Sequence, residues 1–206
     1  MKATIDKTAA ATLLIATSPL MAAAAVAIRV QMGSPVLFRQ TRPGYGGEPF
    51  QIFKFRTMSD ARDAEGNLLP DGERLTTVGQ LLRKASIDEL PQLLNVLRGE
   101  MSLVGPRPLL MRYLDRYSPR QRLRLWAKPG ITGWAQVHGR NAIDWETRLE
   151  LDAWYVENAS IWLDLRILAL TAAQLLRHED VKAGGTADFD EFRGSEGQPA
   201  TQTGAV

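Results

Sequence analysis

The sequence predicts an α+β protein that is mostly α-helical and carries one membrane helix at its N-terminus. Three observations predict this class: a charge-free apolar run near the N-terminus, one pair of alternating segments around a glycine-rich turn, and helical periodicity over most of the remainder. The 206 residues, 45% of them apolar, can bury one core and a small appendage. We expect a re-entrant membrane helix over 1–32, a compact cytoplasmic domain with a small β-hairpin and interfacial amphipathic helices over 33–183, and an acidic, disordered tail over 184–206.

The N-terminal run covers Thr8–Ile28, 21 residues without a charge between Lys7 and Arg29. A straight helix of this length reaches about 31 Å, enough to cross a bilayer. Three interpretations compete: a cleaved signal peptide, a simple spanning helix, and a re-entrant helix that enters the bilayer and returns. The pattern alone does not decide among them.

The dipeptide Ser18-Pro19 favours the re-entrant helix. Pro19 cannot donate to the carbonyl of Ile15 and its ring crowds that turn, so the helix is expected to bend there. The Ser18 hydroxyl can help to satisfy a freed backbone group. Each arm then has ~10 residues and reaches roughly the bilayer midplane. Cations at both ends suit two ends on one cytoplasmic face.

The segments 35–42 and 49–57 alternate apolar and polar residues around Pro43-Gly-Tyr-Gly-Gly47, and they predict a β-hairpin. Residues 59–75 are polar and loop-like. Helical periodicity follows around 75–85, 88–98, 107–126 and 145–178. Tryptophans and tyrosines among the arginines of the later segments are typical of a surface at the headgroup layer, although an ordinary aromatic core explains any one of them equally well.

The charge is unevenly spread. Residues 184–206 carry a net charge of −3, so the remaining residues carry +5 of the total of +2. A basic body suits an anionic membrane surface or a phosphorylated substrate, and nucleic acid is compatible on charge alone. There are no cysteines, which excludes disulfides and thiolate metal sites, and two histidines cannot form a multi-histidine zinc site.

The adjacent carboxylates Asp88 and Glu89 lie among basic residues in the segment that ends in Pro-Arg-Pro at position 108. A nucleophile or metal ligand beside cations that hold phosphate is what anionic substrate chemistry needs. The alternative is structural: acids are common in the first turn of a helix, and Ser86-x-x-Glu89 matches a capping box. Pro91 weakens that alternative because it would fall inside the helix, so we expect the helix to begin at 87–90.

Five ordered motifs carry a specific likeness. They are Lys54-Phe-Arg-Thr-Met58, Leu81-Leu-Arg-Lys-x-Ser-x-Asp-Glu-Leu-Pro-Gln92, Asn95-Val-Leu-x-Gly-x-Met-Ser-Leu-Val-Gly-Pro-Arg-Pro108, Lys128-Pro-Gly-Ile-Thr-Gly-Trp-Ala-Gln136 and Trp154-Tyr-Val-Glu-Asn158. The chain resembles the bacterial sugar transferases, the small monotopic phosphoglycosyl transferases, from its N-terminus to about residue 180. Residues 67–76 resemble the bacillosamine-type members. The chain departs from many relatives at His138, which leaves the role of that position undecided.

The resemblance implies an enzyme on the cytoplasmic face of the bacterial inner membrane. It would move a phospho-sugar from a UDP-sugar to undecaprenyl phosphate and release UMP, the first membrane step of glycan or glycoconjugate assembly. Carried over, Asp88 and Glu89 are the catalytic pair, Mg²⁺ is required, and Ser18 and Pro19 break the membrane helix. The implied partners are the two substrates and the lipid bilayer, without nucleic acid. A homodimer, the identity of the sugar and the pathway are left open.

The chemistry of the residues agrees with this likeness. Asp88 would attack the β-phosphorus and bind Mg²⁺ together with the diphosphate, and Glu89 would take a proton from the acceptor phosphate. The candidate phosphate clamp is Lys54, Arg56, Arg83 and Arg107, because guanidinium forks match phosphate oxygens. Gln136 and Arg140 are candidates for the nucleotide.

Two other classes of protein compete with this one. A membrane-bound scaffold explains the apolar run but not an acidic pair among cations. A soluble glycosyl transferase needs a metal-binding Asp-x-Asp, and the one here, Asp188-Phe-Asp190, falls in the expected disordered tail. No Walker A motif is present.

Overall fold

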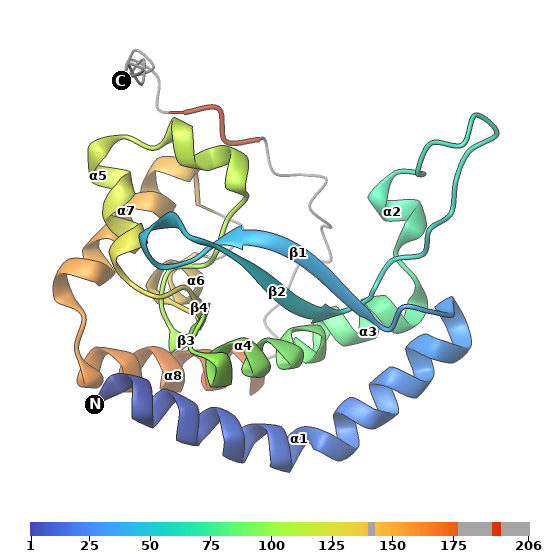
Figure 1. Cartoon of the computed structure of the whole chain (residues 1–206), viewed down its shortest axis with the longest axis horizontal. Coiled ribbons are helices and arrows are strands. Elements are labelled where there is room, and N and C mark those ends of the chain that lie inside the picture. The colour runs from blue at the N-terminus through green and yellow to red at the C-terminus, as the bar shows by residue number, and fades with distance from the viewer. Residues whose placement is uncertain (140–142, 177–190, 195–206) are drawn as a thin grey trace.

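The computed structural model describes residues 1–139, 143–176 and 191–194. It is mostly helical with two small sheets, which confirms the predicted class (Figure 1). The α-helices are α1 Lys2–Met32, α2 Asp71–Arg74, α3 Thr77–Lys84, α4 Leu93–Arg98, α5 Pro119–Arg122, α6 Trp134–Val137, α7 Trp145–Asn158 and α8 Ile161–Leu176. The 3₁₀ helices are η1 Tyr45–Gly47, η2 Ile87–Gln92, η3 Met111–Arg116 and η4 Leu123–Trp126, and the strands are β1 Leu37–Pro43, β2 Pro49–Phe55, β3 Ser102–Val104 and β4 Gly130–Thr132.

Helix α1 is one continuous helix of 31 residues that contains Pro19. The Ser18 hydroxyl donates to the carbonyl of Ile15 at 2.8 Å, so the group that Pro19 leaves without its usual donor has a partner, as expected. Figure 1 shows the helix bent near its middle with both ends turned toward the body. The sequence predicted two separate arms, whereas the structure has one bent helix, because Pro19 removes only one backbone hydrogen bond of the helix. Among the described helices, α1 is the one long and apolar enough to cross a membrane.

Both halves of α1 pack on the same body. Ala10 in the first half belongs to the main core with residues of β2, α4, β3, α7 and α8. Ala24 and Ile28 in the second half pack with Phe55 and Leu82, from β2 and α3. The opposite surface of the helix is apolar and exposed, as at Ile15.

Hydrogen bonds and ion pairs hold each end of α1 to the body. Near its start, Asp6 is buried and accepts from the Ser102 hydroxyl at 2.7 Å, and Lys2 pairs with Asp164 of α8. At its end, the Arg56 guanidinium donates to the carbonyls of Met32 and Ser34, both at 3.2 Å. Both ends of the helix are therefore bonded to the same protein body.

The predicted hairpin is present. Strands β1 and β2 pair antiparallel with Leu37 opposite Phe55, and the glycine-rich turn joins them. A second sheet, β3 with β4, is parallel and was not predicted, since three-residue strands leave no periodic signal. Its close backbone approach requires glycine: a Cβ on Gly105 would lie 2.2 Å from the carbonyl oxygen of Lys128.

The later helical segments are more divided than their periodicity indicates. The segment 107–126 forms η3, α5 and η4, and the segment 145–178 divides into α7 and α8 between Asn158 and Ile161. The expected disordered tail, with its Asp-x-Asp at 188–190, lies outside the described residues except at 191–194. There Phe192 is buried against Tyr113, Tyr117 and Trp145.

Candidate active site

The acidic pair lies on η2, which begins at Ile87 within the predicted range. Ser86, the cap in the capping-box alternative, is in the left-handed region with φ 54°, and its side chain accepts no capping hydrogen bond. Pro91 fits inside the 3₁₀ turn, and the α-helix α4 begins only at Leu93. The capping-box alternative is therefore wrong, and the side chain of Glu89 is used elsewhere.

Glu89 forms two ion pairs through one carboxylate oxygen. Lys54 Nζ of β2 lies 2.7 Å from Glu89 Oε1, and Arg107 Nη2 of the Pro-Arg-Pro loop lies 2.8 Å from the same atom. Burial alone would raise the pKa of Glu89, but the charges of Arg107 and Lys54 outweigh it and hold that pKa far below its usual range. Glu89 is thus a fixed anion that draws two cations to the site.

Asp88 is 9% exposed, and its carboxylate has no hydrogen bond or ion pair within the described part of the chain. Burial and the neighbouring charge of Glu89 raise the pKa of Asp88 to about 6, against the opposing charges of Lys54, Arg83 and Arg107. Its carboxylate is ionised at neutral pH and is not committed to a structural partner. Such a carboxylate can serve as a nucleophile or a metal ligand.

The candidate phosphate clamp divides into two groups. Lys54, Arg83 and Arg107 act electrostatically on Asp88, and Arg83 is further held by a 3.0 Å hydrogen bond from its Nε to Thr57 Oγ1. Arg56 is different: besides the two carbonyls at the end of α1, it donates to the Met58 carbonyl at 3.0 Å and pairs with Asp60 at 2.6 Å. Most of the donors of its guanidinium are thereby used, so Arg56 anchors α1 rather than phosphate.

Two glutamines have buried side-chain atoms without partners. Both amide atoms of Gln136 are buried and unpaired in the described structure, as is the amide nitrogen of Gln92, one turn beyond Asp88. A buried unpaired amide is unusual and marks a place where a ligand or water completes the bonding. Arg140, the other nucleotide candidate, lies outside the described residues. His138 bonds to the Trp134 carbonyl through Nδ1 at 2.9 Å and lies against that ring.

Arg124 and Asp152 were not singled out by the sequence reasoning. Arg124 is one of many arginines, and nothing in its local pattern distinguishes it. The structure buries it against Asp152 and against the Arg107 carbonyl. Only the contact between distant segments reveals its connection to the site.

A resident metal cage is absent from the described residues, in which no group of three or more acidic, histidine or cysteine side chains could hold a metal. Proteins usually bind Mg²⁺ through one or two carboxylates plus substrate phosphates. The uncommitted carboxylate of Asp88 is one donor of that kind. Glu89, already paired twice, is the weaker ligand.

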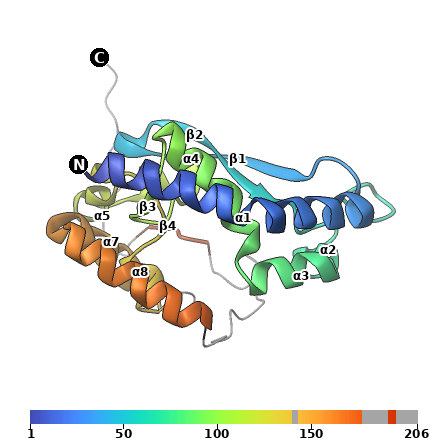
Figure 2. The same cartoon turned by 90° about the horizontal axis from the view of Figure 1, so that it is seen from below.

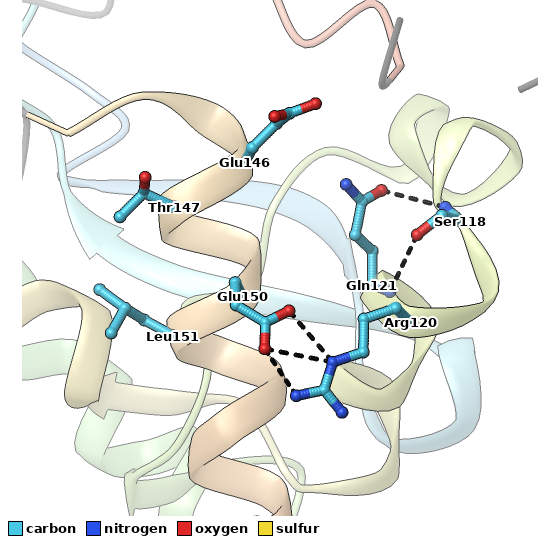
Figure 3. Close-up of a pocket in the computed structure, with 7 residues that line it drawn as sticks. All are labelled: Ser118, Arg120, Gln121, Glu146, Thr147, Glu150 and Leu151. Carbon is cyan, nitrogen blue, oxygen red and sulfur yellow. Dashed lines mark hydrogen bonds and ion pairs between the residues drawn. The ribbon is translucent and has the colours of Figure 1, made fainter. Parts of the chain in front are cut away.

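A recess of about 450 Å³ lies between α5 and α7, apart from the acidic pair (Figure 3). Its one basic side chain, Arg120, points at Glu150, with Nη2 2.6 Å from Oε1. Arg120 also pairs with Glu157. With its cation neutralised in this way, the recess lacks the free positive charge that a phosphate needs.

Comparisons with known proteins agree with the likeness seen in the motifs. Residues 1–178 match the family described as "Bacterial sugar transferase". The chain is 55% identical to the "Uncharacterized sugar transferase EpsL" of Bacillus subtilis, over 95% of this chain and 96% of that protein. It is 46% identical to a "UDP-glucose:undecaprenyl-phosphate glucose-1-phosphate transferase" of Caulobacter vibrioides, over 85% of this chain and 69% of that protein.

A third relative is longer. The "Undecaprenyl-phosphate galactose phosphotransferase" of Salmonella typhimurium is 39% identical over 87% of this chain but only 41% of its own length. The names of these relatives include glucose and galactose, so they do not single out a bacillosamine subtype.

Proposed function

The chain belongs to the bacterial sugar transferase family, and on that premise we propose that it transfers a phospho-sugar from a UDP-sugar to undecaprenyl phosphate and releases UMP. The relatives whose names state a reaction act on undecaprenyl phosphate. The observation that carries the proposal is Asp88, a buried carboxylate without a structural partner beside three cations.

In the first step, an oxygen of Asp88 attacks the β-phosphorus of the UDP-sugar. The bond from that phosphorus to the bridging oxygen breaks, UMP leaves with the electron pair, and an aspartyl phospho-sugar remains. Lys54, Arg83 and Arg107 offset the repulsion between the carboxylate and the diphosphate. When bound, Mg²⁺ would be held by Asp88 and the substrate phosphates and would neutralise part of their charge.

In the second step, an oxygen of undecaprenyl phosphate attacks the same phosphorus and Asp88 leaves as a free carboxylate. The ion pairs of Glu89 make it a weak proton acceptor, because they hold its pKa so low. We therefore revise its expected role from general base to an anion that orients Lys54 and Arg107. A phosphate monoester has a second pKa near 6, so the acceptor is largely a dianion at neutral pH and needs no strong base.

We place the protein on one face of the membrane, with the bent α1 entering the bilayer and returning. Both ends of α1 are bonded to the same body. Moving the N-terminal end to the other side of the membrane would break the bond between Asp6 and Ser102 and leave that carboxylate without its partner. Helix α8 lies on the same side of the molecule as α1 (Figures 1 and 2). It leaves Trp162, Leu165 and Leu175 exposed, which suits contact with lipid at the interface. The cytoplasmic side of the bacterial inner membrane is where a UDP-sugar is available.

For the nucleotide, we retain Gln136. Its carboxamide nitrogen, which carries two N–H donors, and its carboxamide oxygen are without partners, and the edge of a uracil base offers an acceptor and a donor that match them. Arg140 stays a prediction from the sequence. We keep the identity of the sugar open.

The test is a panel of UDP-sugars incubated with enzyme, Mg²⁺ and undecaprenyl phosphate. UMP should be released with one or a few sugars, and release of UDP would instead indicate ordinary glycosyl transfer. No release with any sugar would favour the scaffold alternative. With UDP-sugar alone, mass spectrometry should find a phospho-sugar adduct on Asp88 that is absent from Asp88→Asn, and an adduct on another residue would refute the assignment.

A further inference from the structure

We infer that the buried ion pair of Arg124 and Asp152 is a positioning device for Arg107, and that it acts on the reaction without touching substrate. The inference rests on the proposed role of Arg107 beside the acidic pair. It concerns residues on η4 and α7, far in sequence from η2, which neither the motifs nor the family match assigns to the reaction.

Arg124 links three parts of the fold. Its Nη2 donates to the carbonyl oxygen of Arg107 at 2.6 Å, and its Nη1 donates to the hydroxyl of Tyr117 at 3.0 Å. Its Nε and Nη2 both bond to Asp152 Oδ2, at 3.1 and 2.9 Å. The guanidinium of Arg124 therefore joins the Pro-Arg-Pro loop to the 14-residue helix α7.

The pair is fully enclosed, since the side chains of Arg124 and Asp152 are each 2% exposed. Removing two charges from water is expensive, and apolar residues of similar volume often stabilise a fold equally well or better. A buried pair is therefore weak evidence of stabilisation. The bond to a backbone carbonyl, by contrast, restrains a position, and that carbonyl belongs to the residue that reaches Glu89.

The restraint acts on the site through one short path. Pro106 and Pro108 stiffen the chain on both sides of Arg107, so fixing its carbonyl limits where its guanidinium can lie. That guanidinium pairs with Glu89 at 2.8 Å. If Arg107 moved away, Glu89 would lose one of its two cationic partners, and the site would lose a cation proposed to offset the charge of the diphosphate.

Two variants separate position from stability. Arg124→Lys keeps a positive charge beside Asp152 but cannot reproduce the fork to the Arg107 carbonyl. The double variant Arg124→Met with Asp152→Leu removes both charges and leaves no unpaired ion. The matched control is Arg120→Ala, which breaks ion pairs to the same helix α7 on the exposed surface, in the recess of Figure 3, without a contact to Arg107.

The measurements are thermal unfolding and steady-state kinetics at one pH, with kcat and KM determined separately. Both test variants should lose at least about tenfold in kcat/KM, since a misplacement of about 1 Å can lower a rate by about a hundredfold. The control should keep the wild-type rate. A folded test variant with unchanged kcat/KM would overturn the inference. If the double variant does not fold, Arg124→Lys decides alone.

A readout without turnover separates this inference from the proposed function. Glu89→Gln removes the carboxylate that pairs with Arg107, so its effect on Tm reports how well Arg107 is placed. The loss of Tm from Glu89→Gln at pH 7 should be smaller in the Arg124→Lys background than in wild type. An equal loss would overturn the positioning role whatever substrate the enzyme uses.

Discussion

Replacing Asp88 with asparagine is expected to stabilise the protein while it removes activity. The pKa of Asp88 is raised from 3.8 to about 6 in the folded state, first by burial and then by the charge of Glu89. The folded protein therefore takes up this proton at a higher pH than the unfolded chain does. Ionised Asp88 destabilises the fold above pH 6, and this penalty fades as the pH falls from 6 toward 3.8.

The size of the effect follows from the shift. About two pKa units, at about 1.4 kcal/mol per unit, give an upper bound of about 3 kcal/mol at pH 8. Desolvating the asparagine amide offsets about 1 kcal/mol of this gain. A net stabilisation of about 1–2 kcal/mol corresponds to a rise in Tm of a few degrees for a chain of this length.

The assay is thermal unfolding of wild type and Asp88→Asn in the same detergent or nanodisc, from pH 4 to pH 8. The difference in Tm should be largest at pH 8 and close to zero at pH 4. Glu89→Gln is the matched control with the opposite sign: its carboxylate has a lowered pKa and two cationic partners, so the variant should be less stable than wild type at pH 8. A lower Tm for Asp88→Asn at pH 8, or a gain that persists unchanged at pH 4, would contradict this account of the Asp88 environment.

Three further predictions concern α1 and the nucleotide. Cysteines placed at Ala3 and Ser34 should both be labelled only from the cytoplasmic side, because both ends of the helix are tied to one body; labelling of position 3 from outside would mean a spanning helix. Ser18→Ala with Pro19→Ala restores the backbone bond to Ile15 and should straighten α1. Activity should fall, and a fraction of the molecules should place the N-terminus on the far side of the membrane. A double variant with wild-type topology and rate would show that packing sets the bend. Gln136→Leu should raise KM for the UDP-sugar about tenfold with little change in kcat or Tm, and an unchanged KM would remove Gln136 from the nucleotide site.

The elements with a strong local signal could be predicted from the sequence. The β-hairpin has alternation and a glycine-rich turn, and the start of η2 follows from Pro91. The bonding of Ser18 to Ile15 follows from the missing N–H of Pro19. In each of these the cause lies in one continuous stretch of sequence, or in a residue's own covalent chemistry.

The residues that could carry the chemistry were also visible in the sequence: an adjacent Asp88 and Glu89, an arginine between two prolines, and an apolar helix with a proline inside it. The contacts that these groups make could not be predicted from the sequence. Glu89 matches a capping box by spacing, and only the approach of β2 and the Pro-Arg-Pro loop turns it into the partner of Lys54 and Arg107. Arg56 resembles a phosphate ligand until the fold brings it against the end of α1.

The difference arises because charge and burial are properties of the assembled environment. In an unfolded chain, an aspartate titrates near its ordinary pKa wherever it stands. In the fold, burial and then the charge of Glu89 raise the pKa of Asp88, and cations brought close from other segments oppose that rise. The parallel pair of β3 and β4 and the link from Arg124 to Arg107 likewise join residues that are far apart in the sequence, through contacts that no local period encodes. Those long-range contacts leave the carboxylate of Asp88 unpaired and fix the carboxylate of Glu89 between two cations, and they exist only once the chain has folded.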